Sequence, residues 1–388
     1  MSNSKFALIM ALIVAATPFA IDAYLPAIPY MADFFTVSSE QIATTISLYV
    51  LGLATGQLVG GPLADNYGKR HLILVGLLLF AACSLIIALT HSLLVVQVSR
   101  VIQAIGGGFA MVCIAPLVRE RATGNEAAKL FSLIGLIIVV APAIAPSVGV
   151  LLIYLFGWQS IFFFLFIYAL FVVSISHFKL AKDASSKTAN TSFLRRYRLV
   201  VANREGMRYL VAQGCSFSVM LVFVTNASFI YQKYFALSDA LFALLFSANV
   251  IMMAIFNRYN NFRLNHISAM TLLQQGLWIQ LTGLCLLVLM VIFNAPVAAV
   301  AINIIFIIGA QGAISANSNA VYISHFHEHT GSASALCGAS QFLMAALAGG
   351  LSTLLYNGTL WPAVLVMLGL SLIANGLLLT RPNNSGNE

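Results

Sequence analysis

Along the whole chain, long apolar stretches alternate with short polar breaks. Each stretch runs for about 20 residues, the length that an α-helix needs to cross the hydrocarbon core of a bilayer. The stretches are continuous and do not alternate over ten-residue segments, so helices are expected and a transmembrane β-barrel is not. Twelve spans are predicted, at residues 6–31, 41–63, 72–90, 93–117, 130–153, 159–178, 207–231, 239–257, 268–292, 296–319, 332–356 and 361–380.

One long polar stretch, 179–206, divides the twelve predicted helices into six and six. It predicts an all-α membrane protein with an N-terminal six-helix bundle, a cytoplasmic linker, a C-terminal bundle and a short cytoplasmic tail. The corresponding ranges are 1–178, 179–206, 207–380 and 381–388. The apolar run after Lys5 is longer than the core of a signal peptide, so we expect it to be kept as the first helix.

The composition agrees with a membrane protein, since 61% of the residues are hydrophobic and only 8% are charged. Soluble domains carry about 25% charged residues. The net charge of +8 does not indicate nucleic acid, because the basic residues fall in loops. With the N-terminus in the cytoplasm, 17 of the 19 Lys and Arg residues lie inside and only Lys233 lies outside. The positive-inside rule therefore predicts that both termini lie in the cytoplasm.

Two charged residues lie within predicted spans, Asp22 in the first helix and Arg100 in the fourth. A charge in mid-membrane costs at least about 2.5–3.5 kcal/mol, so it marks a functional site by default. Both residues are expected about 11–13 Å below the outer surface, at 1.5 Å per helical residue. Burial favours the protonated form of Asp22 and Arg100 favours the carboxylate, so Asp22 is a candidate proton carrier. The alternative is a buried ion pair that only fixes helix packing.

The remaining intramembrane polar residues are neutral. They could line a substrate cavity or form hydrogen bonds between helices. The cavity candidates are Tyr24, Gln103, Asn226, Asn249, Asn303 and Gln341. The five scattered cysteines lack CxxC spacing, so neither a disulfide framework nor a metal site is predicted.

The loop between the second and third helices reads Gly-Pro-Leu-Ala-Asp-Asn-Tyr-Gly-Lys-Arg-His at 61–71. It resembles the G-x-x-x-D-R-x-G-R-R signature of the major facilitator superfamily, with Asn66 in place of a basic residue. The matching residues are Gly61, Asp65, Gly68, Lys69 and Arg70. With Arg119 or Glu120 at the end of the fourth helix, this loop is predicted to act as a conformational latch.

Three further stretches narrow the resemblance. Arg-Val-Ile-Gln-Ala-Ile-Gly-Gly at 100–107 is similar to the family's fourth-helix pattern, in which the arginine is linked to proton transfer. Asp-Ala-Tyr-Leu-Pro-Ala-Ile-Pro at 22–29 resembles the first helix of Bcr/CflA-type drug-resistance transporters. Small residues of the fifth helix resemble the packing motif of drug:proton antiporters. They are Gly135, Ala141, Pro142, Ala145, Pro146 and Gly149.

The resemblance implies two six-helix halves and proton-driven export of drugs or toxic lipophilic compounds, without a cofactor. The partners it implies are a small lipophilic substrate, protons and the lipid bilayer, and a monomer is expected. Export of a normal metabolite, such as an amino acid or sugar derivative, is the main alternative. An ATP-driven pump is not expected, because the sequence does not contain the G-x-x-x-x-G-K-[ST] loop that binds the nucleotide phosphates. A membrane-embedded enzyme is not expected, because the predicted spans contain no paired catalytic groups at one membrane depth. A channel is not expected either, because the sequence shows no filter-like repeat.

Overall fold

The computed structural model describes residues 3–122, 124–180, 193–326 and 330–379. Within these ranges it leaves out the side chains of residue 65, of most of 124–139, and of 193–197 and 330–332. Every described element is helical, and the elements follow the predicted spans closely. The first half contains α1 (Asn3–Asp22), η1 (Leu25–Ala27), α2 (Ile28–Phe35), α3 (Ser39–Tyr67), α4 (Lys69–Leu89), α5 (Leu93–Val112), α6 (Ile114–Arg121), α7 (Gly124–Phe156) and α8 (Gln159–Lys179).

A short helix, α9 (Phe193–Ala202), lies within the stretch that the sequence predicts to be a linker. The second half follows it. Its elements are α10 (Arg204–Ser228), the π-helix η2 (Phe229–Tyr234), α11 (Asp239–Arg263), α12 (Ala269–Ile292), α13 (Val297–Ser324), α14 (Thr330–Leu354) and α15 (Trp361–Leu379).

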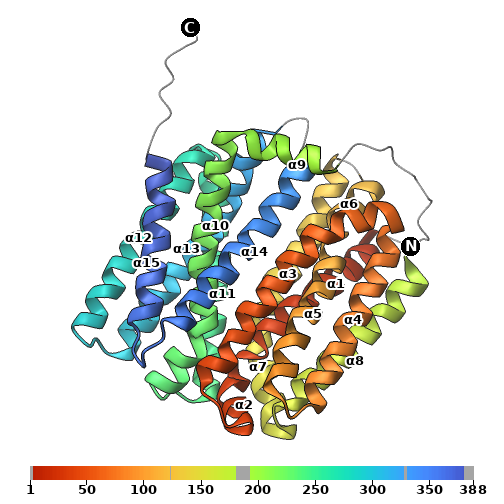
Figure 1. The fold of residues 1–388 in the computed structure, drawn as a ribbon. Coiled ribbons are helices and arrows are strands. Elements are labelled where there is room, and N and C mark those ends of the chain that lie inside the picture. The colour runs from red at the N-terminus through yellow and green to blue at the C-terminus, as the bar shows by residue number, and fades with distance from the viewer. Residues whose placement is uncertain (1–2, 123, 181–192, 327–329, 380–388) are drawn as a thin grey trace.

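The two halves stand side by side, with their long helices roughly parallel (Figure 1). They meet along two helix pairs, α3 with α14 and α7 with α11. The short helices α6 and α9 lie at one end of the molecule and α2 lies at the other. These ends are called the α9 end and the α2 end below.

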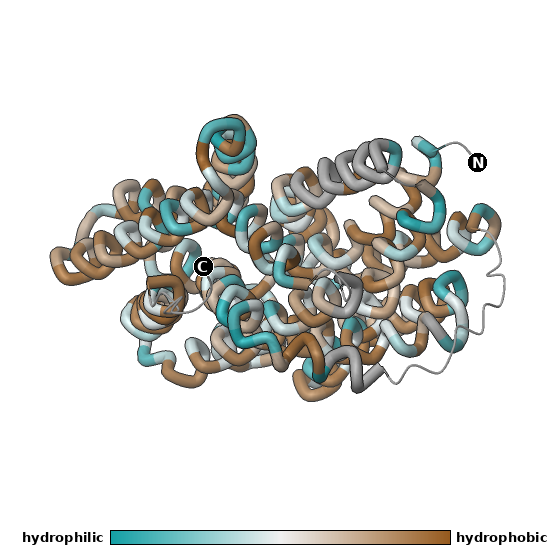
Figure 2. The backbone as a smooth tube through the Cα atoms, turned by 90° about the horizontal axis from the view of Figure 1, so that it is seen from above, coloured by the Kyte–Doolittle hydropathy of each residue, from teal (hydrophilic) through white to brown (hydrophobic). Residues whose placement is uncertain are grey.

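Eleven helices in the described part of the chain are long and apolar enough to cross a membrane, and Val140–Phe156 of α7 adds a shorter apolar stretch. The predicted twelve-helix architecture is therefore confirmed. Large apolar side chains such as Tyr154, Phe178 and Phe293 are exposed, as expected where lipid is the solvent. Seen from above, hydrophobic segments occur in helices throughout the molecule (Figure 2).

Local sequence signals explain several helix ends at the polar breaks. Ser38 begins α3 with a capping box, because its hydroxyl accepts from the Gln41 amide N–H and the Gln41 side chain accepts from the Ser38 N–H. The hydroxyls of Ser238 and Ser268 cap α11 and α12 by accepting from the N–H groups of Leu241 and Thr271. Gly68 separates α3 from α4 at φ 89°, a conformation that only glycine adopts without strain.

Candidate functional site

The first membrane helix breaks at the residue that carries its acid. Helix α1 ends at Asp22, a single 3₁₀ turn follows at Leu25–Ala27, and α2 resumes at Ile28. Pro26 lacks an N–H and cannot donate to the Asp22 carbonyl, which explains the interruption. The Asp22 side chain is buried at this break, with 7% of its surface exposed. The break therefore holds a carboxyl group among irregular backbone within the membrane-spanning region.

Arg100 on α5 is fully buried and reaches back to α1. Its Nη1 donates to the Ala20 carbonyl oxygen at 2.9 Å and to Gln103 Oε1 at 3.1 Å. The guanidinium lies 4.4 Å from the ring centre of Tyr24 and 4.6 Å from that of Tyr49. Aromatic faces attract cations, so the two rings partly replace the water that the charge has lost.

The remaining donors of Arg100 are unpaired. Its Nε and Nη2 are buried without a hydrogen-bond partner among the described residues, and so is the Tyr49 hydroxyl. No ion pair in the described ranges joins Asp22 to Arg100, although Arg100 contacts α1 two residues before Asp22. The structure thus brings the two predicted residues to adjoining elements and leaves them unpaired in this conformation.

Gln103 extends this site toward α4. Besides accepting from Arg100, its amide donates to the Ser84 hydroxyl at 2.7 Å. Tyr24 is likewise held in place, by a 2.8 Å hydrogen bond between its hydroxyl and that of Thr45. These two predicted cavity residues therefore orient the arginine, and they are fully buried here.

The predicted cavity residues of the second half contact neighbouring helices. Asn226 donates to the Ser352 hydroxyl on α14 at 2.9 Å. Asn303 donates to the Gly283 carbonyl at 2.9 Å, and Gln341 accepts from Gln213 at 3.3 Å. Asn249 donates to Leu245 within its own helix, and its Oδ1 has no partner among the described residues. Their role in lining a cavity stays a prediction.

The predicted latch residues lie at the α9 end of the first half. Lys69 pairs with Glu120 of α6 at 2.5 Å, and Arg70 donates to the carbonyl oxygen of His177 on α8 at 2.6 Å. Gly61 lies in α3 and Arg119 in α6, while the Asp65 side chain lies outside the described part. The basic pair after Gly68 therefore joins α4 to two other helices of its own half.

The predicted small-residue face of α7 packs against the broken first helix. Ala141, Ala145, Pro146 and Gly149 are buried, whereas Pro142 is partly exposed. Gly135 lies in α7, and its burial is outside the described part. A Cβ added to Gly149 would overlap the Ala23 carbonyl oxygen. This close approach places α7 directly behind the residue that follows Asp22.

Sequence reasoning missed a polar cluster that joins the two halves at the α2 end. We name it the interhalf cluster; its members are Tyr30, Glu40, Lys233, Asp239 and Tyr356. The Tyr30 hydroxyl donates to Asp239 at 2.5 Å, and Lys233 pairs with Glu40 at 3.1 Å. Burial and a hydrogen bond to Glu40 both raise the pKa of Tyr356, so its hydroxyl remains a donor. The only signal in the sequence was the isolated Lys233.

Comparison with known proteins settles the family. The Major Facilitator Superfamily profile matches residues 10–349. The chain belongs to this superfamily. A bicyclomycin resistance protein homolog from Haemophilus influenzae is 26% identical over 370 residues, covering 94% of this chain and 93% of its own. The multidrug resistance protein MdtL of Escherichia fergusonii is 28% identical over 224 residues, 58% of this chain and 57% of its own.

Solved structures support the same superfamily fold. A D-xylose–proton symporter superposes with a TM-score of 0.74 at 15% identity, covering 95% of this chain and 97% of its own. The Escherichia coli xylose transporter XylE, described as partially occluded and inward open, gives a TM-score of 0.73 at 14% identity over the full length of both chains. At this identity the likeness establishes the major facilitator fold and nothing about substrate.

Proposed function

We propose that this protein is a proton-coupled exporter of drugs or other toxic lipophilic compounds. It works by alternating access in the bacterial inner membrane as a transporter without enzymatic activity, and the proton gradient drives it without a cofactor. The names of the relatives support this substrate class, since one is a bicyclomycin resistance homolog and another a multidrug resistance protein. The superfamily and the multi-pass helical architecture support the transport mechanism.

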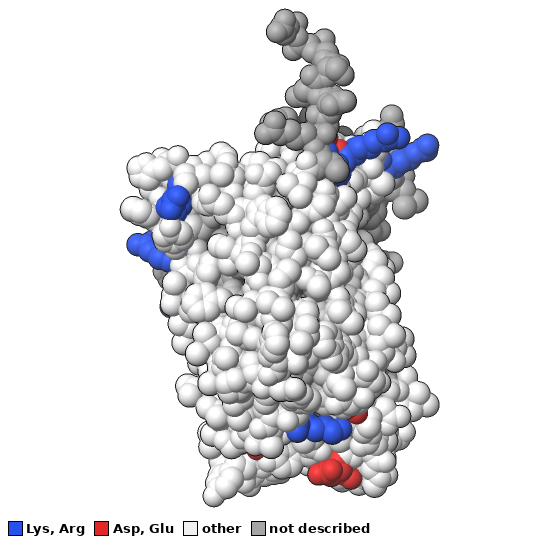
Figure 3. Space-filling view, turned by 90° about the vertical axis from the view of Figure 1, so that its left-hand side faces the viewer, with Lys and Arg blue, Asp and Glu red and all other residues white. Residues whose placement is uncertain are grey.

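The proposed orientation places the α9 end in the cytoplasm and the α2 end outside. Basic residues gather at the α9 end, whereas the α2 end shows acidic residues and one basic group on the face drawn in Figure 3. This is the charge asymmetry that the positive-inside rule associates with the cytoplasmic side. The interhalf cluster therefore closes the outer side in this conformation.

One observation supports the coupling mechanism: the Asp22 carboxyl is buried at the helix break, and the Nε and Nη2 of Arg100, which contacts α1 two residues earlier, are buried without a hydrogen-bond partner among the described residues. A neutral, protonated Asp22 tolerates this burial, whereas a buried carboxylate requires a paired charge or hydrogen bonds. Loss of the proton therefore creates a carboxylate that needs a partner, and we infer that the helix break then moves until the Nε and Nη2 of Arg100 donate to it. Charge-assisted bidentate pairing of this kind is strong.

The transport cycle follows from this exchange. Substrate binding from the cytoplasm releases the Asp22 proton inward, and the new carboxylate turns to Arg100. The halves then rock, the interhalf cluster separates, and the substrate leaves outward. Protonation of Asp22 from outside frees Arg100 again and favours return to the conformation described here.

Proteoliposomes test this function. Purified protein is reconstituted with a pH-sensitive dye inside, a proton gradient is imposed, and lipophilic antibiotics and cationic dyes are added. Substrate-dependent proton flux is expected in the native protein and is expected to fall at least about tenfold in Asp22→Asn, which cannot exchange a proton. The matched control is Asp33→Asn, an exposed acid on α2, which should retain the flux.

The outcomes separate the possibilities. Flux that survives in Asp22→Asn refutes this carboxyl as the proton carrier. If no compound in the panel drives flux while an amino acid or sugar derivative does, the substrate assignment fails and metabolite export replaces it.

A further inference from the structure

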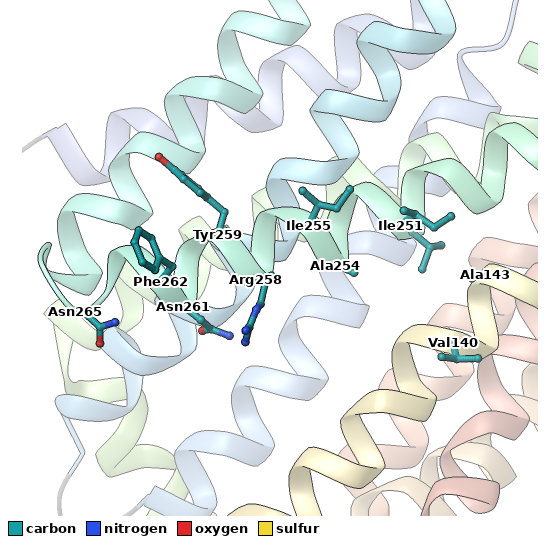
Figure 4. Close-up of a pocket in the computed structure, with 11 residues that line it drawn as sticks. Val140, Ala143, Ile251, Ala254, Ile255, Arg258, Tyr259, Asn261, Phe262 and Asn265 are labelled. Carbon is teal, nitrogen blue, oxygen red and sulfur yellow. The ribbon is translucent and has the colours of Figure 1, made fainter.

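A groove of about 840 Å³ opens between α7 of the first half and α11 of the second. Figure 4 shows Val140 and Ala143 on α7 across from the α11 side chains. The groove lies along the half of α11 that ends at the α9 end, so in the proposed orientation it faces the inner leaflet. Its lining residues are Val140, Ala143, Val250, Ile251, Ala254, Ile255, Arg258, Tyr259, Asn261, Phe262 and Asn265.

The groove is amphipathic along its length. The part away from Arg258 is apolar, with Val140 on one wall and Val250, Ile251 and Ile255 on the other. Its mouth carries the exposed side chains of Arg258, Asn261 and Asn265. Eight helical residues separate Val250 from Arg258, which corresponds to about 12 Å at 1.5 Å per residue. That length along α11 accommodates a large part of an acyl chain beside a charged head group.

Arg258 differs from the other arginine on the same helix. Among the described residues, the structure gives its guanidinium no hydrogen bond and no ion pair. Arg263 instead donates to the Tyr259 hydroxyl at 2.6 Å and lies 5.6 Å from the ring centre. In Figure 4, Arg258 and Asn261 extend from the side of α11 opposite Tyr259. The Asn261 amide donates one hydrogen bond to Asn257 Oδ1 at 3.2 Å, and its second N–H is left for a ligand. The mouth therefore presents a cation and an amide that can both donate to an anion.

We propose that this groove binds an anionic phospholipid of the inner leaflet, with the phosphate on Arg258 and Asn261 and one acyl chain along the apolar wall. The planar guanidinium donates two parallel hydrogen bonds to a phosphate, and the anionic leaflet supplies such groups at this depth. The site goes beyond the proposed transport reaction and rests only on its membrane orientation.

The bound lipid also bears on the conformation, because the groove walls belong to different halves. Just beyond the apolar end, the Ser247 hydroxyl donates to the Ala143 carbonyl oxygen at 2.5 Å and ties α11 to α7. If the two halves closed at the α9 end, the groove would narrow and the acyl chain of the lipid would be expelled. The lipid therefore stabilises the conformation described here.

Lipid binding to the full-length protein tests the proposal without any proton gradient. Delipidated protein in detergent is titrated with phosphatidylglycerol and with phosphatidylcholine, and bound lipid is counted by native mass spectrometry. Arg258→Gln should weaken phosphatidylglycerol binding about tenfold, as expected for loss of charge-assisted hydrogen bonds. Arg263→Gln removes the same charge from the same helix outside the groove, and it should leave the affinity within about twofold.

A second variant tests the apolar part. Ala254→Trp fills the groove with an indole and should also weaken phosphatidylglycerol binding about tenfold at unchanged thermal stability. If Arg258→Gln and Arg263→Gln lost the same amount of phosphatidylglycerol affinity, the proposed site would be refuted. The lipid would then be attracted to basic residues in general. Unchanged binding in Ala254→Trp, or equally strong competition by glycerol 3-phosphate, would overturn the role of the acyl chain. Proton flux is not measured, so failure here leaves the transport proposal standing.

Discussion

A single buried arginine organises the centre of the first half. The Nη1 of Arg100 donates to Ala20 and Gln103, and its guanidinium lies over the rings of Tyr24 and Tyr49, which together make a fully buried cation tolerable. The planar guanidinium can make directed hydrogen bonds and stack on aromatic rings at the same time. Its Nε and Nη2 are left without a hydrogen-bond partner among the described residues.

Replacing Arg100 with lysine tests whether shape matters beyond charge. Arg100→Lys keeps the positive charge but loses the planar arrangement, so substrate-driven proton flux in proteoliposomes is expected to fall at least about tenfold. Arg263→Lys, on the surface of α11, serves as the control and should transport normally. Full flux in Arg100→Lys would show that a point charge is sufficient.

Asp22 and Arg100 could be found from the sequence because charged residues are costly within apolar runs and therefore stand out. Their lack of a mutual ion pair could not be found, because it depends on how α1 and α5 are rotated about their axes. The interhalf cluster was inaccessible for a similar reason. Tyr30 and Asp239 are 209 residues apart, and only the approach of the two halves brings them together.

At the scale of elements, the broken first helix is held by close packing against α7. Apolar stretches predicted the helix positions well, since α8 runs from Gln159 to Lys179 where 159–178 was expected. The structure adds a break in the first predicted helix, where α1 ends at Asp22 and the turn that contains Pro26 begins. The π-helix η2 and the short helix α9 had no comparable signal, because hydrogen-bond register and surface packing leave little trace in hydropathy.

Gly149→Ala measures how tightly α7 is packed against α1. The added methyl group would overlap the Ala23 carbonyl oxygen, so the backbone must shift, and we expect a loss of about 1–3 kcal/mol of stability. Gly350→Ala is the matched control, since nothing lies within 4 Å of the added Cβ. It should leave the Tm unchanged or raise it slightly. Equal Tm values for both variants, measured in the same detergent, would contradict the close approach.

At the scale of the whole molecule, the two halves are joined at the α2 end and form a groove toward the α9 end. At the α2 end, the hydrogen bond of Tyr30 and the ion pair of Lys233 add to a buried apolar cluster that contains residues of both halves. Polar contacts of this kind can be exchanged for contacts with water when the halves separate. An exposed ion pair contributes only about 0.2–1 kcal/mol. Such a contact biases the equilibrium between conformations without locking it.

Lys233→Gln should therefore shift this equilibrium toward separation of the α2 end. From the strength of an exposed ion pair, the ratio of open to closed molecules is expected to rise by up to about fivefold. Spin labels at Asp33→Cys and Ala240→Cys, with the exposed Cys285 replaced by serine, report the distance between the halves. Arg263→Gln is the control for loss of a positive charge. An unchanged distance distribution in Lys233→Gln would exclude the ion pair as a determinant of the equilibrium.

The interhalf cluster also bears on how much of the proton gradient the cell loses through idle transporter molecules. In the proposed orientation, molecules joined at the α2 end shield the buried carboxyl of Asp22 from external protons. The larger the joined fraction, the less proton-motive force idle molecules dissipate. The contacts at this end thereby lower the energy that a cell loses by keeping the protein in its membrane while no substrate is present.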